Sequence, residues 1–295
     1  MRKVRSRTRD RLAALLFLTP QTVGLFLFTL MPICFAFVIG LYNWEMLVPP
    51  RFTGLANFIQ LIHDSTFYES MWNTVFYLIT YLPINIVLSL LFAVLLTRFA
   101  SRTSSFFQGI YFMPIIIPTV AVALVFKFLY QFPRGLVTSI LAILGIAGPN
   151  WMGDPSWAMF GIVLMSVWKF FGYNLVILIA AIREIPKELL EAASIDGAGS
   201  TRKFVSIMLP LITPALFFAI VMTTIFSFQV FEQAFVMTGG GPANATTTIV
   251  MYIYQNGFTF FKMGYAAAIS VVVFLIIAIL TLIQWRGQRF WVHYQ

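Results

Sequence analysis

Charged residues are scarce in this sequence of 295 residues, since Asp, Glu, Lys and Arg together make up only 10% of it. An ordinary soluble domain has roughly 25%. Hydrophobic residues make up 60%, which is more than a soluble chain of this length could readily bury. Cysteine is nearly absent, because Cys34 is the only one, and this excludes a disulfide framework and a cysteine-rich metal site. The composition therefore indicates a membrane protein.

The motifs of common enzymes are absent as well. The sequence contains no GxxxxGK[ST] phosphate loop, no HExxH and no GxSxG. Its two histidines, His63 and His293, are far apart along the chain. We therefore expect no catalytic residue, no metal site and no cofactor bound by this chain. The net charge of +9 is spread over short basic clusters between apolar runs, a pattern that reports membrane topology and argues against a nucleic-acid partner.

Six apolar stretches are long enough to cross a lipid bilayer, since a spanning helix needs about 20 mostly apolar residues. They cover residues 12–42, 71–97, 106–130, 157–182, 212–237 and 265–285. Prolines inside them do not exclude spanning helices, because neighbouring helices can satisfy the freed carbonyl groups. We predict an all-α polytopic membrane protein with six transmembrane helices, in which residues 1–295 form a single transmembrane domain.

Lys and Arg residues are unevenly divided between the two sides of this topology. Most fall on the side that carries both termini, whereas Arg51, Arg134 and Lys262 fall on the other side. Since positive residues are enriched in cytoplasmic loops, we predict that both termini are cytoplasmic. Among the outward segments, residues 136–146 are apolar but too short to span, so we expect a short helix at the membrane interface. Residues 238–242, Thr-Gly-Gly-Gly-Pro, predict a flexible outward turn.

The inward loop at residues 184–210 has the signals of a helix, a turn and a second helix. Pro186 is suited to the first turn of a helix over residues 187–195. Asp196 and Gly197 then predict a turn, and Ser200 is expected to cap the second helix. An ordinary amphipathic loop would explain the same composition. Small residues give this loop a surface that another protein could approach closely: Ala192, Ala193, Gly197 and Ala198.

A spacing within this loop connects the sequence to a known family. It reads Glu191-Ala192-Ala193, three residues, Gly197, nine residues, Ile207, one residue, and Leu209-Pro210. This resembles the signature of the permease subunits of binding-protein-dependent ABC importers, and Ile195-Asp196-Gly197-Ala198 resembles the carbohydrate branch. Residues 238–242 with Thr246, Thr247 and Thr248, and residues 264–270, agree with it. The Gly-Gly-Pro turn resembles the maltose-type first permease.

The resemblance implies several partners. They are a second homologous permease, a cytoplasmic dimer of ABC ATPase subunits that binds the ATP and Mg²⁺, and an extracytoplasmic solute-binding protein. It also implies a place in a prokaryotic inner membrane. By this resemblance, Glu191 would be the charged anchor for the ATPase. The surface packed closely against the ATPase would consist of Ala192, Ala193 and Gly197, with Asp196 in the turn. The link to the fifth span would consist of Ile207, Leu209 and Pro210. Simple packing at a helix entry is an alternative role for the last three.

Polar side chains inside spans are candidates for the transport path, because they are costly in a membrane. Ser166, Lys169, Phe170 and Tyr173 share one face of the fourth span, and Thr223, Phe226 and Ser227 share a face of the fifth. In the resembled maltose-type subunit, the corresponding positions line the sugar site. Lys169 could pair with a charged group of the substrate or with a carboxylate of the second permease, or it could serve in a buried ion pair or in helix packing. Asn85, Ser89 and Asn174 are weaker candidates.

The function predicted from the sequence is that of a non-enzymatic permease subunit forming half of the path of a sugar, driven by a separate ATPase. The alternative is an ion-coupled secondary transporter. Such a protein usually needs carboxylates inside the membrane, whereas all ten acidic residues map to loops or span ends, with Glu232 the deepest. A channel is disfavoured because no filter-like segment is found.

Overall fold

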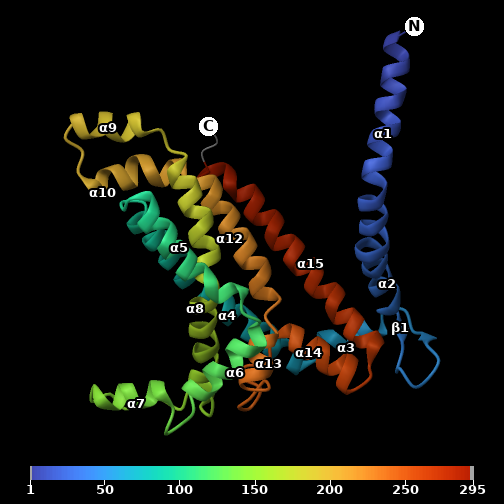
Figure 1. The fold of residues 1–295 in the computed structure, drawn as a ribbon. Helices are drawn as coiled ribbons and strands as arrows, with labels where there is room; N and C mark the ends of the chain where they lie inside the picture. The colour runs from blue at the N-terminus through green and yellow to red at the C-terminus, as the bar shows by residue number, and fades with distance from the viewer. Residues whose placement is uncertain (1, 293–295) are drawn as a thin grey trace. The chain divides into compact units, whose positions relative to one another are not determined.

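The computed structural model describes residues 2–292, so His293 lies outside the described part. Within that part the regular secondary structure is helical except for one hairpin, in which β1 (Tyr42–Asn43) pairs antiparallel with β2 (Arg51–Phe52) (Figure 1). The longer helices are α1 (Arg2–Leu25), α2 (Met31–Ile39), α4 (Ser65–Leu96), α5 (Ser101–Ile116), α6 (Thr119–Leu129), α8 (Pro155–Arg183), α9 (Lys187–Ile195), α12 (Thr213–Phe228) and α15 (Met263–Gly287). The all-α prediction is confirmed.

Shorter helices and π-helical turns connect these elements. The short helices are α3 (Ala56–Ile62), α7 (Leu136–Ile143), α10 (Ser200–Lys203), α11 (Leu209–Leu211), α13 (Glu232–Met237) and α14 (Ile249–Tyr254). The π-helical turns are Phe26–Leu30, Phe204–Met208 and Gln255–Thr259, and a 3₁₀ turn, Gln288–Phe290, follows α15. The apolar segment at residues 136–146 thus contains a short helix, α7, as its length predicted.

Among the described residues, four helices are long and apolar enough to cross a membrane. They are Ala13–Ile39, Ser65–Leu96, Pro155–Arg183 and Met263–Phe290. Two bent pairs, Arg102–Ile116 with Thr119–Leu129 and Ser200–Leu211 with Thr213–Phe228, bring the number to six if each pair is one span. In the first of these helices, Phe17 and Phe28 are 85% and 82% exposed. A lipid environment explains such exposure, since apolar side chains face hydrocarbon at no cost.

The predicted span over residues 106–130 is two helices joined at a sharp break. α5 ends at Ile116, α6 begins at Thr119, and their axes differ by 93°. Ile117 is extended, with φ −71° and ψ 134°, because the residue before a proline is disfavoured in the helical conformation. Pro118 also lacks the N–H group that would continue the helix. The stretch predicted at residues 212–237 is interrupted too, since α12 ends at Phe228 and α13 begins at Glu232.

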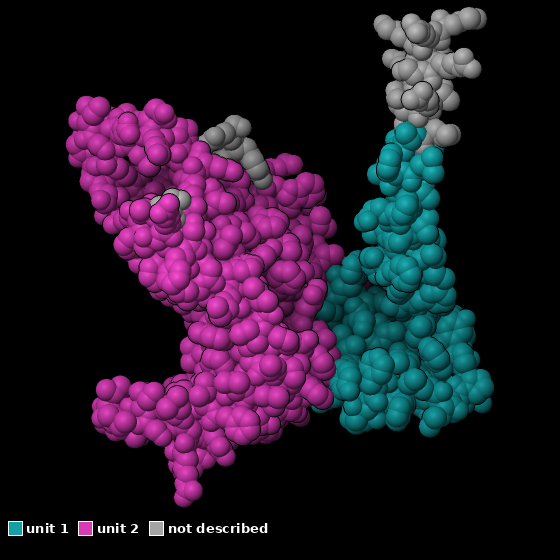
Figure 2. Space-filling model, in the orientation of Figure 1, with its two compact units in different colours: residues 1–64, 253–274 teal, residues 65–252, 275–295 magenta. Residues whose placement is uncertain are grey.

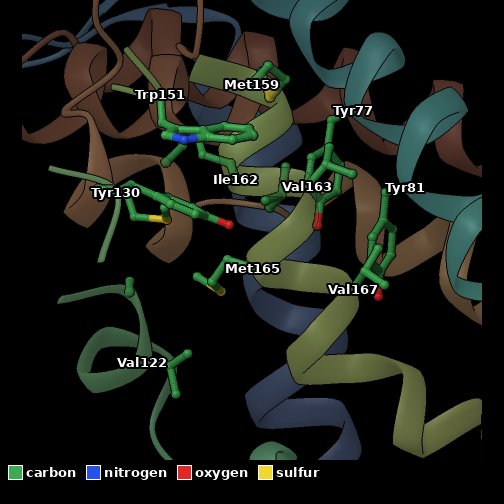
Figure 3. Packing of buried hydrophobic residues seen from close by; sticks show 14 of the residues in the cluster. Tyr77, Tyr81, Val122, Tyr130, Trp151, Met159, Ile162, Val163, Met165 and Val167 are labelled. Carbon is green, nitrogen blue, oxygen red and sulfur yellow. The ribbon is translucent and has the colours of Figure 1, made fainter. Parts of the chain in front are cut away.

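Helix α8 is the most buried of the spanning helices, with 61% of its apolar window inside the protein. One buried cluster packs its N-terminal half, where the rings of Tyr130 and Trp151 stack with centroids 5.3 Å apart (Figure 3). A second cluster packs its other half against α4 and α12. At Gly172, an added Cβ would collide with the carbonyl group of Tyr111. Glycine at this position therefore allows the backbones of α5 and α8 to approach closely.

The chain forms two compact units, residues 1–64 with 253–274 and residues 65–252 with 275–295 (Figure 2). In the first unit, the Tyr265 hydroxyl donates a hydrogen bond to the Asp64 carboxylate, and the Gly264 N–H donates to the Trp44 carbonyl at 3.2 Å. These bonds hold the start of α15 to the segment around the hairpin. The loop and the cavity described below both lie in the second unit.

The segment at residues 238–248 is a packed, hydrogen-bonded loop, which corrects the prediction of a flexible turn. Thr246, Thr247 and Thr248 are all buried. The Thr248 hydroxyl donates to the Val230 carbonyl at 2.7 Å, and the Asn73 side chain on α4 donates to the Thr247 carbonyl at 3.1 Å. The glycines suggested mobility, but the following threonines satisfy the backbone groups of this loop and fix it against α4 and the end of α12.

Candidate functional site

The predicted helix in the loop at residues 184–210 is present with its predicted bounds, as α9 (Lys187–Ile195). Pro186 precedes it in an extended conformation and is its N-cap. Leu190 and Ala193 face the protein, where Leu190 packs against the second buried cluster. Glu191 and Ala192 are exposed on the other side. The exposed surface of the loop therefore includes the Glu191 carboxylate and Ala192, whereas Ala193, which was predicted to share that surface, is buried.

Gly197 ends this helix through its backbone conformation. Its φ is +79°, in the left-handed region that glycine adopts without strain. With Asp196 as C-cap, the Ala198 N–H donates to the Ala193 carbonyl at 2.8 Å, and the Gly197 N–H donates to the Ser194 carbonyl at 3.1 Å. These two bonds form a Schellman motif, which satisfies carbonyls that the helix end would otherwise leave unpaired. Gly197 thus has a conformational role within the loop.

The second helix of the loop, α10 (Ser200–Lys203), has Gly199 as its N-cap, and no side chain caps it. The predicted cap at Ser200 is therefore wrong by one position, because Ser200 already has a helical conformation. Lys203 donates from Nζ to the Ser194 hydroxyl at 2.5 Å, which ties α10 to α9. The residues of the predicted link to the fifth span are half-buried, with Ile207 in a π-helical turn and Leu209 and Pro210 in α11.

A cavity of about 590 Å³ lies among α4, α8, α12 and α13 in the second unit. Its volume falls in the range of roughly 300–1,000 Å³ that is typical of small-molecule sites. Both polar and aromatic side chains line it: Tyr77, Tyr81, Ile115, Phe170, Tyr173, Asn174, Thr223, Phe226, Gln229, Val230, Phe231, Glu232, Gln233 and Val250. Four of the residues predicted for the substrate path, Phe170, Tyr173, Thr223 and Phe226, are among them.

A chain of polar side chains crosses the wall of this cavity. The Asn85 Nδ2 donates to the Tyr81 hydroxyl at 3.1 Å, and the Asn174 Nδ2 donates to Asn85 Oδ1 at 2.7 Å and to the Thr223 hydroxyl at 2.9 Å. Three helices, α4, α8 and α12, are joined in this way. The Asn174 Oδ1 is buried without a hydrogen-bond partner. Leaving a buried acceptor unpaired costs about 1–3 kcal/mol, so this atom is a site of unsatisfied polarity beside the cavity.

Ser166 and Ser227 do not line the cavity. Each hydroxyl donates to a carbonyl of its own helix, Ser166 to Ile162 at 2.8 Å and Ser227 to Thr223 at 2.7 Å. Both side chains are almost fully buried. Hydroxyls bonded one turn back on the same helix are common in spanning helices, and this arrangement accounts for both residues without a ligand.

Lys169 also lies outside the cavity lining, at the break between α5 and α6. Its Nζ donates to the Pro114 carbonyl at 3.0 Å and to the Ile117 carbonyl at 2.5 Å. Its ammonium group also lies 5.2 Å from the centre of the Phe170 ring. Carbonyls freed by a proline break need donors inside a membrane, and Lys169 supplies them.

The cavity contains residues that the sequence prediction omits. Tyr77 and Tyr81 come from α4, where with Asn85 they follow a spacing of four residues that places all three on one helix face. That spacing could have revealed them. Gln229 and Glu232 come from the interruption between α12 and α13, which a continuous span does not predict. Among the described residues that line the cavity, Glu232 alone carries a charge.

Metal coordination has no candidate in the described part of the chain. Within residues 2–292, no group of three or more His, Cys, Asp and Glu side chains is placed to hold a metal ion.

Comparison with known proteins assigns the family. The model of a family described as "Binding-protein-dependent transport system inner membrane component" matches residues 85–289, more than half of the chain. The chain belongs to this family. It is a multi-pass inner-membrane component, and its predicted recognition as a permease is confirmed.

Similar proteins include three transport permeases. The probable ABC transporter permease protein YurN of Bacillus subtilis (strain 168) is 35% identical over 94% of this chain and 96% of its own length. The lactose transport system permease protein LacF of Rhizobium radiobacter is 33% identical, with 93% of each chain covered. The sn-glycerol-3-phosphate transport system permease protein UgpA of Escherichia coli O157:H7 is 39% identical over 83% of each chain.

A solved structure shares the fold of this inner-membrane component. It is that of a bacterial alginate ABC transporter in complex with an alginate pentasaccharide-bound periplasmic protein. One of its chains matches with a TM-score of 0.82 over 98% of both chains, at 22% sequence identity.

Proposed function

We propose that this chain is a permease subunit of an ATP-driven sugar importer and that the 590 Å³ cavity is part of the sugar path. The observation that carries the proposal is the wall of this cavity. It combines aromatic rings, such as Phe170 and Tyr173, with a chain of polar side chains that ends in the unpartnered Asn174 Oδ1. Sugars need both features, because hydroxyls require hydrogen-bond partners and the apolar face of a ring packs on an aromatic plate.

The charge of the cavity favours a neutral sugar. Glu232 gives the lining one negative charge. Lys169 lies outside the lining and donates to backbone carbonyls, and its ammonium group also interacts electrostatically with Glu232. A carboxylate in an enclosed site repels an anionic solute more strongly than it would in water. Two similar proteins are named for solutes of different charge, since lactose is neutral and glycerol phosphate is anionic. For this chain we propose a neutral oligosaccharide or related carbohydrate.

We further propose that residues 184–210 couple transport to ATP hydrolysis in a separate ATPase dimer. Exposed Glu191 and Ala192 beside the turn at Gly197 offer a protruding helix of the kind that fits a groove. A second homologous permease would complete the path, and a solute-binding protein would deliver the sugar. Since this inner-membrane component carries most of its Lys and Arg on the side of its termini, we place both termini in the cytoplasm.

Reconstitution tests the proposal directly. Proteoliposomes containing this chain, its second permease, the ATPase and the solute-binding protein are supplied with ATP while ionophores collapse the ion gradients. We expect sugar uptake that requires ATP and survives the loss of the gradients. Uptake that stops when the gradients alone are collapsed would identify an ion-coupled secondary transporter and refute the proposed function.

A further inference from the structure

A second cavity, of about 490 Å³, lies where α4 and α8 end and is bordered by the loop helices α9 and α10. Four cationic side chains line it: Arg98, Arg183, Lys187 and Lys203. Its remaining wall is mostly apolar, with residues such as Ile182 and Met208 from the second buried cluster. No carboxylate of the described residues belongs to the lining. We call this site the basic cavity.

The four cations retain free hydrogen-bond donors. Arg183 donates from Nη2 to the Ser104 hydroxyl at 2.8 Å, and Lys203 donates to Ser194. A guanidinium has five N–H donors and an ammonium three, so both groups can bind a further acceptor. For Arg98 and Lys187, no side-chain hydrogen bond to another described residue is present. Like charges gathered around one cavity repel each other, and an anion placed between them relieves that repulsion.

An apolar groove continues from the basic cavity along a spanning helix. The groove has a volume of about 400 Å³ and is lined on α4 by Val87, Leu90, Leu91 and Val94. It shares Val94, Arg98, Ser200 and Phe204 with the basic cavity. Val87 and Leu91 are 60% and 57% exposed. At ~1.5 Å per residue, the stripe from Val87 to Arg98 is about 16 Å long, a length that suits an acyl chain lying along α4.

We propose that the basic cavity and this groove together bind one anionic phospholipid. The phosphate group lies among the four cations at the membrane surface, and one acyl chain follows α4 into the bilayer. A soluble anion would use the cavity and leave the groove empty, and an acidic segment of a partner protein would have no reason to extend along a spanning helix. Anionic headgroups are attracted to clusters of Lys and Arg next to membrane spans, and here the cluster is a formed cavity.

This lipid would connect α4 to the loop helices, because Lys187 belongs to α9, Lys203 to α10 and Arg98 follows α4. A ligand that binds the ordered loop stabilises it by mass action. The position of residues 184–210 then depends on the anionic lipid content of the membrane. The inference does not depend on which solute the chain carries.

Native mass spectrometry of the purified full chain from nanodiscs tests the proposal. The nanodiscs contain equal amounts of dioleoyl-phosphatidylglycerol and dioleoyl-phosphatidylcholine. We expect the chain to retain phosphatidylglycerol selectively. Since each Lys or Arg contributes about 1 kcal/mol to the attraction of an anionic headgroup, Arg98→Gln with Lys187→Gln should weaken retention about 30-fold. The matched control, Arg202→Gln, removes an exposed charge from α10 outside the cavity and should retain the lipid.

A groove variant separates a lipid from other anions. Val87→Trp fills the groove without changing charge, and we expect it to reduce phosphatidylglycerol retention. Equal retention of the two lipids by the wild-type chain would overturn the proposal. So would unchanged retention in the Arg98→Gln, Lys187→Gln variant. Binding of inorganic phosphate together with lipid retention unaffected by Val87→Trp would identify a soluble-anion site. Release of the lipid when the ATPase is added would identify the cavity as a protein contact, which also contradicts the proposal.

Discussion

Replacing Gly197 by alanine should uncouple ATP hydrolysis from uptake while leaving the chain inserted. An added Cβ at Gly197 has no atom within 4 Å, so the change creates no collision. The strain comes from φ at +79° alone, which disfavours an L-residue by about 1–2 kcal/mol. The equilibrium between the capped and frayed ends of α9 should therefore shift about 5- to 30-fold towards fraying. The Schellman bonds from Ala198 and Gly197 would then be lost for a larger part of the time.

Two further variants make this prediction specific. Gly199 has φ −68° and also has open space around its Cβ position, so Gly199→Ala is a control with the same chemical change and no strain. Gly197→Asn should fall between wild type and Gly197→Ala, because asparagine tolerates the left-handed region better than alanine. The assay compares uptake per ATP hydrolysed in proteoliposomes and the thermal unfolding of each chain. Equal losses in Gly197→Ala and Gly199→Ala, or normal coupling in Gly197→Ala, would refute the conformational role of Gly197.

Three predictions concern the membrane part. Asn174→Leu should reduce sugar uptake at least tenfold, since it removes an unpartnered acceptor from a residue of the cavity lining. Ser227→Ala, which changes a bond within one helix, should leave uptake near wild type. Glu232→Gln removes the only charge among the described lining residues, so competition by an anionic sugar such as digalacturonate should strengthen. The gain should be below the roughly 30-fold expected for an isolated charge ~8 Å away at an effective dielectric constant near 20, because Lys169 offsets part of the Glu232 charge. Unchanged competition would place the charge outside the path. Lys169→Met leaves the Pro114 and Ile117 carbonyls without their donor, so the free energy of unfolding should fall by about 1–3 kcal/mol for each carbonyl and the unfolding temperature should fall with it. Lost uptake at an unchanged unfolding temperature would instead support a contact with the solute.

The break at Ile117 and Pro118 explains why Lys169 could not be placed from the sequence. Its position on a polar face of α8 made it a candidate for the solute path. The carbonyls that it binds belong to Pro114 and Ile117, which precede it by 55 and 52 residues. Which face of α8 meets a break in another helix is a matter of long-range packing, and no local pattern reports it.

Only part of the cavity lining could be predicted, because local spacing reports a helix face and long-range packing decides what that face meets. Phe170, Tyr173, Thr223 and Phe226 were found because polar and aromatic residues at helical spacing mark one face of a single helix. Ser166 lies on the predicted face of α8 but bonds its own backbone. Spacing alone cannot distinguish a hydroxyl that faces a cavity from one that bonds a carbonyl one turn away, since both have the same local sequence.

The sequence by itself determined the membrane class, the approximate spans and the bounds of α9. These depend on composition over about 20 residues and on local signals such as Pro186 and Gly197, whose backbone preferences act wherever they occur. The tertiary structure decided which polar groups face the cavity, which cation completes the α5–α6 break, and that the loop at residues 238–248 is packed. Those features arise from contacts between distant helices, which become specific only when the helices are assembled.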